Sequence, residues 1–335
     1  MHEVYFTLMV MNTPIHSPRR RAALLSLALA MSCTVHAQQP KPLRIIVPYA
    51  PGGTGDVIAR LVAQEITQGT GQAVVVDNRP GGAGVIGAAA AAKADADGST
   101  LLLGYTSELV ISPSLVKGGV AYATDRDFKP VAFAGSTPLL LIAGNNVPGN
   151  TLAEFIVAAK AKPGAYSYAT AGNGSPAHIA GALLARISGT QLLNVPYKGG
   201  AQAVTDVLAG NVSVYFSGMP PAVPLVKGGK VKALGVAAKM PSPTLPAVPA
   251  LANSYRELDL SGWFGFLAPA ATPQASVSAL HDKLKAILQT PTIKARLLEL
   301  GVETQAMSET EFGAFIKAEQ AKYAALMKSL DIQPE

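Results

Sequence analysis

The hydrophobic positions of this chain alternate between short β-branched runs and segments with helical spacing. Residues 43–47 read Leu-Arg-Ile-Ile-Val, a run typical of a buried strand. Apolar residues then recur at helical spacing over residues 56–67. Further strands are predicted at 73–76 and 101–104, with a glycine- and alanine-rich helix at 82–92 between them. This alternation predicts an α/β fold with a mostly parallel sheet covered by helices on both faces.

The same alternation begins again after residue 130. Strands are predicted at 131–135, 139–143, 166–170, 193–196, 212–216, 231–237 and 263–267. Helices are predicted at 151–160, at 175–187, in a segment that ends at Gly210, and in three segments at the C-terminal end. Ser308 and Glu311 form a capping box at the start of the last helix. The repetition predicts two lobes, and periodicity alone leaves open which lobe takes the C-terminal segment.

The N-terminal residues have the layout of a secretory signal peptide. Three arginines, Arg19 to Arg21, precede an apolar run at 22–31, and Val35-His36-Ala37 is a small-x-small cleavage site. The apolar run is shorter than the ~20 residues that span a bilayer. We therefore expect export by the Sec or the twin-Arg route, cleavage after Ala37 and a periplasmic location.

Charge and cysteine content narrow the possible functions. Cleavage after Ala37 would leave 24 basic and 20 acidic residues, a net charge of +4, and would remove Cys33. A mature chain without cysteine excludes disulfides, thiol nucleophiles and cysteine-based metal sites. Its two histidines, His178 and His281, lie far apart in sequence and argue against zinc. No basic run remains, so we expect no nucleic acid, and we predict neither a metal nor a cofactor.

Three glycine-rich turns, each between a strand and a helix, carry the functional argument. They lie at residues 48–56, 170–178 and 196–200. A helix N-terminus offers backbone N–H groups and a positive dipole end, which together bind small anions. In open α/β sheets such turns line the crevice at the carboxyl ends of the strands. The three turns predict a cleft that binds a carboxylate through dipoles and hydroxyls, since arginines do not cluster near them.

Two other motifs have weaker interpretations. Residues 82–87 spell GxGxxG, but five residues separate them from the preceding strand, so we interpret them as a packing helix and not as a dinucleotide site. Ser175 and His178 suggest an exported hydrolase as an alternative function. Their spacing within one helical turn is poor for a Ser–His relay, and no orienting acid is evident. We therefore predict no catalytic residue.

The motifs of the chain together resemble the tripartite tricarboxylate transporter receptor family, the Bug-type (TctC-like) extracytoplasmic solute-binding proteins. The resemblance covers essentially the whole mature chain in family order. It rests on the segments Ile46-Val-Pro-Tyr-Ala-Pro-Gly-Gly-Thr-Gly-Asp56 with Ala59-Arg60, Val76-Asp-Asn-Arg-Pro-Gly-Gly-Ala-Gly84, Asp97-Gly-Ser-Thr-Leu-Leu102, Gly174-Ser-Pro-Ala-His178, Val195-Pro-Tyr-Lys-Gly199 and Gly262-Trp-Phe-Gly265.

This resemblance implies a two-lobed periplasmic binding protein of the type II, Venus-flytrap kind, with a ligand cleft between the lobes. Lobe 1 would combine residues 38–136 with 263–335, and lobe 2 would be 137–262. The implied function is capture of a small carboxylate-bearing solute by lobe closure, and its delivery to the membrane components of a tripartite tricarboxylate transporter. We expect a monomer and no enzymatic activity. A receptor that signals to a membrane sensor stays open as an alternative.

The resemblance also implies the residues that bind the solute. These are Tyr49, Gly53, Thr54 and Asp56 from one lobe and Thr170, Gly174, Ser175 and His178 from the other, flanked by Thr106, Ser107, Tyr197 and Lys198. Tyr49 stands where the family often has Phe, which adds a hydroxyl near the anion. Glu108 is a second departure. Facing the cleft, it would disfavour a second carboxylate and favour an amine or amide; we expect it to point to solvent, where it would have no such effect.

Overall fold

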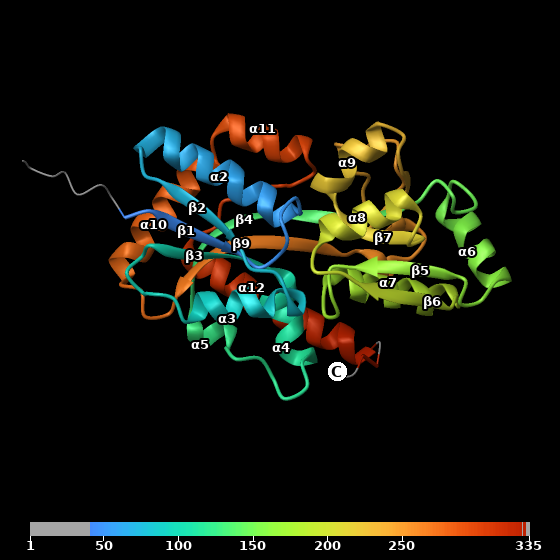
Figure 1. Cartoon of the computed structure of the whole chain (residues 1–335), viewed down its shortest axis with the longest axis horizontal. Coiled ribbons are helices and arrows are strands. Elements are labelled where there is room, and N and C mark those ends of the chain that lie inside the picture. Colours follow the sequence, from blue (N-terminus) through green and yellow to red (C-terminus); the bar gives the residue numbers. More distant parts are fainter. Residues whose placement is uncertain (1–40, 330, 333–335) are drawn as a thin grey trace, which may run out of the picture. The chain divides into compact units, whose positions relative to one another are not determined.

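The computed structural model describes residues 41–329, 331 and 332, so the predicted signal peptide, its cleavage site and Cys33 lie outside the described residues (Figure 1). The strands are β1 Leu43–Val47, β2 Val74–Asn78, β3 Thr100–Tyr105, β4 Phe128–Ala143, β5 Tyr166–Thr170, β6 Leu192–Pro196, β7 Val214–Gly218, β8 Lys232–Val236 and β9 Ser261–Pro269. The α-helices are α2 Thr54–Thr70, α3 Val85–Ala92, α4 Ser112–Leu115, α5 Thr124–Asp127, α6 Leu152–Ala161, α7 Pro176–Ser188, α8 Gly200–Ala209, α9 Met219–Lys227, α10 Gln274–Leu288, α11 Pro291–Glu299 and α12 Glu309–Ser329. Shorter turns are η1 Gly82–Gly84, η2 Ser107–Ile111, η3 Leu251–Asn253 and η4 Arg256–Leu258, of which η2 is π-helical.

The strands follow the order β2-β1-β3-β9-β4-β7-β5-β6, and β8 also pairs with β4. The prediction of a mostly parallel sheet is wrong at its centre, because β4 and β9 run antiparallel to every strand they pair with. The βαβ units on either side, β1 with β2 and β3 and β5 with β6 and β7, are parallel as expected. Helices cover the outer strands, while the two antiparallel strands join the halves of the sheet.

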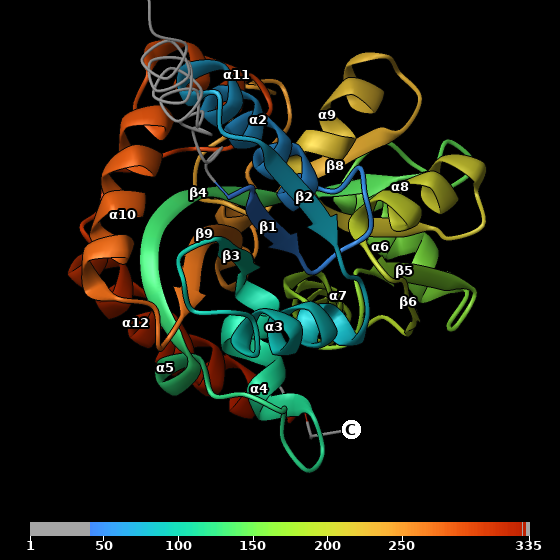
Figure 2. The ribbon, with the colours of Figure 1, turned by 60° about the vertical axis from the view of Figure 1, so that its left-hand side comes forward.

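Strand β4 connects the two halves of the molecule. Its first part pairs with β9, while in its last part Leu139 to Ala143 pair with β7 and Leu140 to Ala143 pair with β8. Two separate strands were predicted here, but the structure has one strand, which Figure 2 shows as strongly curved. Its pairing with β9 shifts register between Pro130 and Ala132 and again between Phe133 and Gly135, and such bulges bend a strand without ending it.

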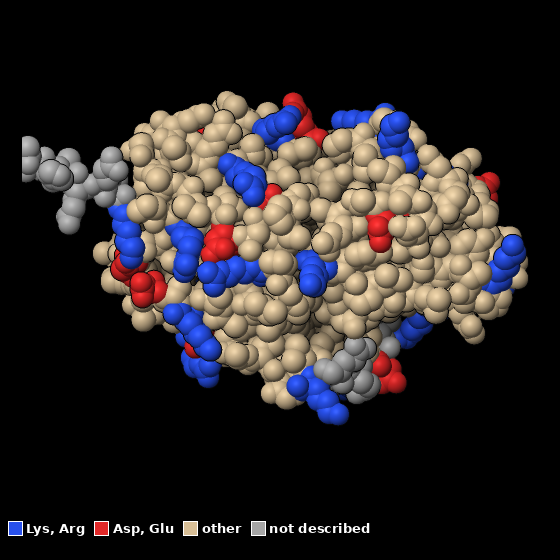
Figure 3. Space-filling model, viewed as in Figure 1, with Lys and Arg blue, Asp and Glu red and all other residues tan. Residues whose placement is uncertain are grey.

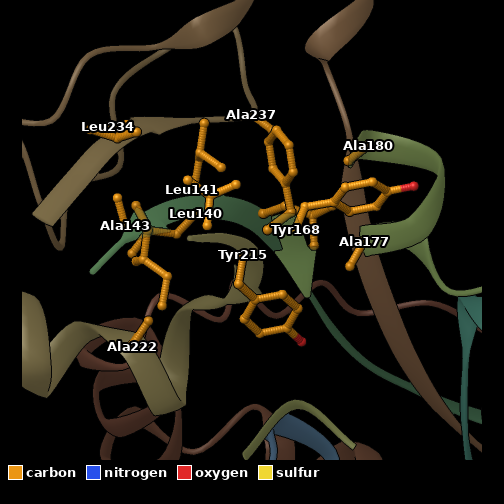
Figure 4. Close-up of a cluster of buried hydrophobic side chains, with 14 of the residues drawn as sticks. Leu140, Leu141, Ala143, Tyr168, Ala177, Ala180, Tyr215, Ala222, Leu234 and Ala237 are labelled. Atoms are coloured by element: carbon orange, nitrogen blue, oxygen red, sulfur yellow. The ribbon is translucent and has the colours of Figure 1, made fainter. Parts of the chain in front are cut away.

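Separate hydrophobic cores lie in the two halves. One is built from buried residues between Leu139 and Leu260, and Figure 4 shows the part of it around Leu140, Leu141 and Tyr168. The other half has two clusters that combine residues before β4 with residues of β9 and the C-terminal helices. The C-terminal helices therefore pack with the N-terminal strands. The lobe boundaries at 136/137 and 262/263 stay a prediction.

The helices differ from the predictions in a few places. The predicted helix at 82–92 begins only at Val85, because Ala83 and Gly84 have left-handed backbone angles. Helices α4, α5 and α9 were not predicted. The capping box of α12 is confirmed, since Ser308 and Glu311 exchange side-chain-to-backbone hydrogen bonds.

The face in Figure 3 is mostly uncharged, with scattered basic and acidic side chains, as the low charge content predicts. Among the residues that the structure describes, no helix combines the length and apolar character needed to traverse a bilayer.

Candidate functional site

Four helix N-termini meet at one small cavity of about 50 Å³, hereafter the small cavity. Its lining includes the first residues of α2, α7, α8 and α9, which begin after the N-cap residues Gly53, Ser175, Gly199 and Gly218. Helix α2 comes from the N-terminal half and the other three come from the half that contains β5 to β8. Because the first N–H groups of a helix lack partners within that helix, the starts of α2, α7 and α8 make the cavity attractive to an anion. Helix α9 adds its dipole and the N–H of Met219 only, since Pro220 and Pro221 have no N–H.

The rest of the small cavity is aromatic. Tyr105 and Phe264 stack with ring centroids 4.4 Å apart, and Tyr49 meets Tyr105 edge-on at 5.8 Å. Tyr215 and Phe216 supply further rings. None of the described residues that line the cavity is Lys, Arg or His. The chemistry of the cavity therefore combines apolar walls with main-chain dipoles and hydroxyls.

A second and larger cavity of about 410 Å³ lies next to this site, hereafter the large cavity. It is lined from the N-terminal half by Gly82, Ala83, Ser112, Leu115 and Val116, from the other half by Gly172, Asn173, Gly174, His178, Pro196, Tyr197 and Lys198, and also by Ile332. The glycine segment interpreted as a packing helix therefore also forms part of a cavity wall.

The twelve predicted site residues divide into three groups of four. The small cavity is lined by Tyr49, Gly53, Thr54 and Ser175. The large cavity is lined by Gly174, His178, Tyr197 and Lys198. Neither cavity is lined by Asp56, Thr106, Ser107 and Thr170. The last group supports the loops instead.

Asp56 holds the first glycine loop in place. Its carboxylate accepts the backbone N–H of Gly52 at 3.0 Å, Nε of Arg60 at 2.9 Å and the side-chain amide of Asn78 at 3.1 Å. Burial alone would raise its pKa, but these three hydrogen bonds and the charge of Arg60 outweigh burial and lower the pKa. The side chain is therefore an ionised anchor of the loop.

The hydroxyl groups of Thr106, Thr170 and Tyr197 also form hydrogen bonds within the protein. The hydroxyl of Thr106 accepts the backbone N–H of Trp263 at 2.9 Å. The hydroxyl of Thr170 accepts the N–H of Gly172 at 3.3 Å and so shapes the second glycine loop. The hydroxyl of Tyr197 donates to Asp206 at 2.6 Å, and burial together with this bond raises its pKa to about 12.

The two halves touch each other at the glycine loops. A Cβ placed on Gly218 would lie 2.4 Å from Oγ1 of Thr54, and one on Gly172 would lie 3.1 Å from Cβ of Ala83. Ser107 Oγ also lies 2.8 Å from the carbonyl oxygen of Gly174, a hydrogen bond between the halves. The structure is thus closed over the small cavity, and only glycine permits this approach of the chains.

Ser175 and His178 are bound to the helix start and not to each other as a relay. The hydroxyl of Ser175 accepts the backbone N–H of His178 at 3.3 Å as the N-cap of α7, and Pro176 is the first helical residue. Nδ1 of His178 accepts the N–H of Gly174 at 3.2 Å. These bonds fix the second glycine loop.

The expectation that Glu108 points to solvent is wrong. Glu108 is fully buried in the π-helical turn η2, where Oε1 accepts the backbone N–H of Tyr105 at 2.6 Å and Oε2 lies 2.9 Å from Oη of Tyr49. Burial raises the pKa of this carboxyl to about 8, although hydrogen bonds from its own main-chain N–H, from that of Tyr105 and from Tyr49 oppose the shift. It lines neither cavity, but it touches a side chain that lines the small one.

Several lining residues were missed by the sequence reasoning. They are Tyr105, Tyr215, Phe216, Pro221 and Phe264, together with the N-terminus of α9. A signal for α9 was present, because Pro220 and Pro221 lie two and three residues after Gly218 and proline favours the first turn of a helix. The aromatic residues lie on β3, β7 and β9. They meet at one cavity because of the order of the strands in the sheet, which the sequence pattern did not predict.

Over the described part of the chain, no group of three or more His, Cys, Asp or Glu side chains is arranged to hold a metal ion.

Known proteins resemble this chain over most of its length. The sequence pattern of the "Tripartite tricarboxylate transporter family receptor" matches residues 58–332. BugT of Bordetella pertussis is 33% identical over 290 residues, which cover 86% of this chain and 89% of BugT.

Solved structures extend the likeness to the fold. The periplasmic binding protein BugD has 31% identity and a TM-score of 0.84, with 88% of this chain and 99% of BugD covered. Rpa4515 of R. palustris, solved with adipate, has 30% identity and a TM-score of 0.85, with the same coverage. The predicted α/β fold of a two-lobed periplasmic binding protein is thereby confirmed.

Proposed function

Because this chain belongs to the tripartite tricarboxylate transporter receptor family, as its motifs predicted, we propose that it is an extracytoplasmic receptor for a small carboxylate-bearing solute. The observation that carries the proposal is the meeting of four helix N-termini, from both halves of the molecule, at one small cavity. A carboxylate there would receive main-chain hydrogen bonds and favourable dipoles without any basic side chain. Rpa4515, a relative of this chain, was solved with adipate.

The cavity also restricts the rest of the solute. A volume of about 50 Å³ accommodates roughly three to five waters, at about 10–15 Å³ each. Aromatic rings surround this space, so an apolar group next to the carboxylate would pack against Tyr49, Tyr105 or Phe264. We assign direct contact with the solute to Tyr49, Gly53, Thr54 and Ser175. A solute with a longer carbon chain would have to extend toward the large cavity.

We assign the remaining predicted residues to the surroundings of the solute. Gly174, His178, Tyr197 and Lys198 would form the approach through the large cavity. Asp56, Thr106, Ser107 and Thr170 would hold the loops from behind. The lobes, 38–136 with 263–335 and 137–262, would open about β4 and the segment that leads into β9, and binding would favour the closed form.

The proposal includes the cellular role. A signal peptide cleaved after Ala37 would send the chain to the periplasm, where the closed receptor would act as a monomer and dock on the membrane components of a tripartite tricarboxylate transporter. The hydrolase alternative loses support because the Ser175 hydroxyl accepts a hydrogen bond as an N-cap and Nδ1 of His178 accepts one from Gly174.

A thermal-unfolding screen tests the proposal. Mature protein is heated with acetate, propionate, benzoate, malate or adipate, and a carboxylate at 100 times its Kd should add about 2.7 kcal/mol to the free energy of unfolding. The replacement Gly218→Ala should weaken binding at least tenfold, because the new methyl group would meet Thr54 in the closed form. Gly69→Ala is the matched control, since nothing lies within 4 Å of a Cβ at that position. Failure of every carboxylate to raise the melting temperature would overturn the proposal.

A further inference from the structure

Glu108 lines neither cavity, but hydrogen bonds connect it through Tyr49 to residues that line both. Its Oε2 contacts Oη of Tyr49, which lines the small cavity. The same Tyr49 hydroxyl lies 3.0 Å from the carbonyl oxygen of Ala83, and Oγ of Ser107 lies 2.9 Å from that carbonyl and 2.8 Å from the carbonyl of Gly174. Ala83 and Gly174 line the large cavity from opposite halves of the molecule. One hydrogen-bond network therefore joins Glu108 to the contact between the halves.

The proton on Glu108 decides how the hydrogen atoms of this network are distributed among its acceptors. With that proton present, Glu108 donates to Tyr49, Tyr49 donates to the Ala83 carbonyl, and Ser107 is left to donate across the cleft to Gly174. The Tyr49 hydroxyl and the carbonyls of Ala83 and Gly174 then each have one donor, while the Ser112 hydroxyl, 3.5 Å from Oγ of Ser107, lies at the edge of the network.

Ionised Glu108 changes this distribution. Tyr49 now donates to the carboxylate, which is the stronger acceptor, and the carbonyls of Ala83 and Gly174 compete for the single hydrogen of Ser107. One buried carbonyl loses its partner, which is costly in a closed interface. The ionised carboxylate also places a negative charge next to the cavity proposed for an anion. Both effects favour the open form.

We propose that Glu108 is a positioning residue for solute capture: protonated, it lets Ser107 bind Gly174 and hold the lobes closed, and ionised, it releases them. The proposal rests on the proposed function for its solute, while the link between Glu108 and the contact of the two halves stands on the hydrogen bonds alone.

The tyrosines around Glu108 do not lose their protons below pH 9, so a change of charge at this place in that range comes from Glu108. Three tyrosines contact Glu108: Tyr49 from the loop after β1, Tyr105 from β3 and Tyr122 before α5. Helix α12 also packs against η2, and its buried titratable groups are Glu319 and Tyr323. Burial raises the pKa of each of the four tyrosines above its ordinary value, so they stay neutral at pH 9. Glu319 is bound to Nε1 of Trp263 and to Lys322.

The test measures solute affinity against pH. Isothermal titration uses whichever of acetate, propionate, benzoate, malate or adipate binds best, between pH 6.5 and pH 9. Because the pKa of Glu108 is about 8, the competent fraction falls to about one tenth at pH 9, and the Kd of the wild type should rise about tenfold. Glu108→Gln should keep the Kd nearly constant, since its amide can donate to Tyr49 and accept from Tyr105 as the protonated acid does. The matched control Glu319→Gln, another buried carboxylate, should retain the tenfold change.

A second measurement covers the case in which Glu108→Gln does not fold. Titration of the wild type at pH 8 in two buffers of different ionisation enthalpy should show uptake of roughly half a proton per solute bound. Ser107→Ala should bind more weakly at pH 6.5 and lose most of the pH dependence.

The outcomes separate the two proposals. Binding with a constant wild-type Kd and no proton uptake would overturn the role of Glu108 and leave the receptor function standing. Binding of no carboxylate at any pH would overturn the receptor function; the pH dependence of unfolding, which needs no solute, would still test the proton on Glu108.

Discussion

Two buried carboxylates stand behind the loops of the small cavity, and the fold treats them in opposite ways. Asp56 and Glu108 are both almost inaccessible, at 4% and 0% exposure. Asp56 accepts three hydrogen bonds, one of them from the cationic Arg60, whereas Glu108 accepts from a backbone N–H and a phenol with no cation beside it. The pKa of Asp56 is lowered and that of Glu108 is raised to about 8. At Glu108 burial outweighs the hydrogen bonds, whereas at Asp56 the hydrogen bonds and the charge of Arg60 outweigh burial. This balance decides which carboxylate is a fixed anchor and which one can gain and lose a proton near neutral pH.

The largest expected effect is on the pH dependence of folding. Glu108 binds its proton more tightly folded, with a pKa of about 8, than unfolded, near its ordinary value of 4.5. Its contribution is therefore complete below the unfolded pKa and is lost as pH rises through the folded pKa. Between pH 5 and pH 8 the free energy of unfolding should fall by about 1.4 kcal/mol per pH unit from this group. Urea unfolding of wild type and Glu108→Gln across this range measures it, and an equal slope in both proteins would contradict the prediction.

The second-largest expected effect is the loss of folding stability when the anchor Asp56 is replaced. Asp56→Asn should lower the free energy of unfolding by about 2–3 kcal/mol at pH 7, because the hydrogen bonds to the charged group are weakened or lost. The loss should shrink in acid, because the lowered pKa means that Asp56 stabilises the fold above its unfolded pKa and stops doing so as pH falls through its folded value. Asp77→Asn is the control: this carboxylate pairs with the half-exposed Arg79, and its loss should cost less than about 1 kcal/mol. If Asp56→Asn and Asp77→Asn lowered the free energy of unfolding equally at pH 7, Asp56 would be no more important to the fold than a surface ion pair.

The smallest expected effect is on the unfolding free energy of a variant of Tyr49, the cavity residue that contacts Glu108. Tyr49→Phe removes one donor from Glu108 and should cost about 1 kcal/mol at pH 9, where the carboxylate needs that donor most. The pH midpoint of the stability loss should move upward, because the ionised form loses a hydrogen bond that favours it. The curve of unfolding free energy against pH provides both numbers. A midpoint that stays in place would mean that the hydroxyl does not stabilise the carboxylate.

Local signals predicted much of this arrangement. Glycine, proline and N-cap residues mark the loops at 48–56, 170–178 and 196–200 in the sequence. Each loop leads into a helix whose first residues line the small cavity. Turn and cap preferences depend on few neighbouring residues, which is why they are readable from sequence. The fourth helix start, at Met219, has the same kind of signal in Pro220 and Pro221 but follows no glycine-rich loop of the expected pattern.

What the sequence could not predict depends on distant contacts. Glu108 is buried because Tyr49, Tyr105 and Tyr122 close around it from three other segments, and no local pattern marks the π-helical turn that carries it. The division of the twelve site residues between two cavities likewise depends on how closely the two halves approach. The curvature of β4 depends on bulges formed with β9, a strand more than a hundred residues later in the chain.

The origin of the small cavity's polarity has a consequence for evolution. Main-chain N–H groups at the starts of α2, α7 and α8, together with the dipoles of all four helices, supply it, and no substitution of a side chain deletes a main-chain N–H unless it introduces proline. Mutations of Tyr49, Tyr215 or Phe264 would therefore reshape the walls while the attraction for negative charge persisted. After duplication of its gene, a copy of this chain could acquire a new solute by substitution of aromatic residues alone. Every intermediate along that path would still bind anions.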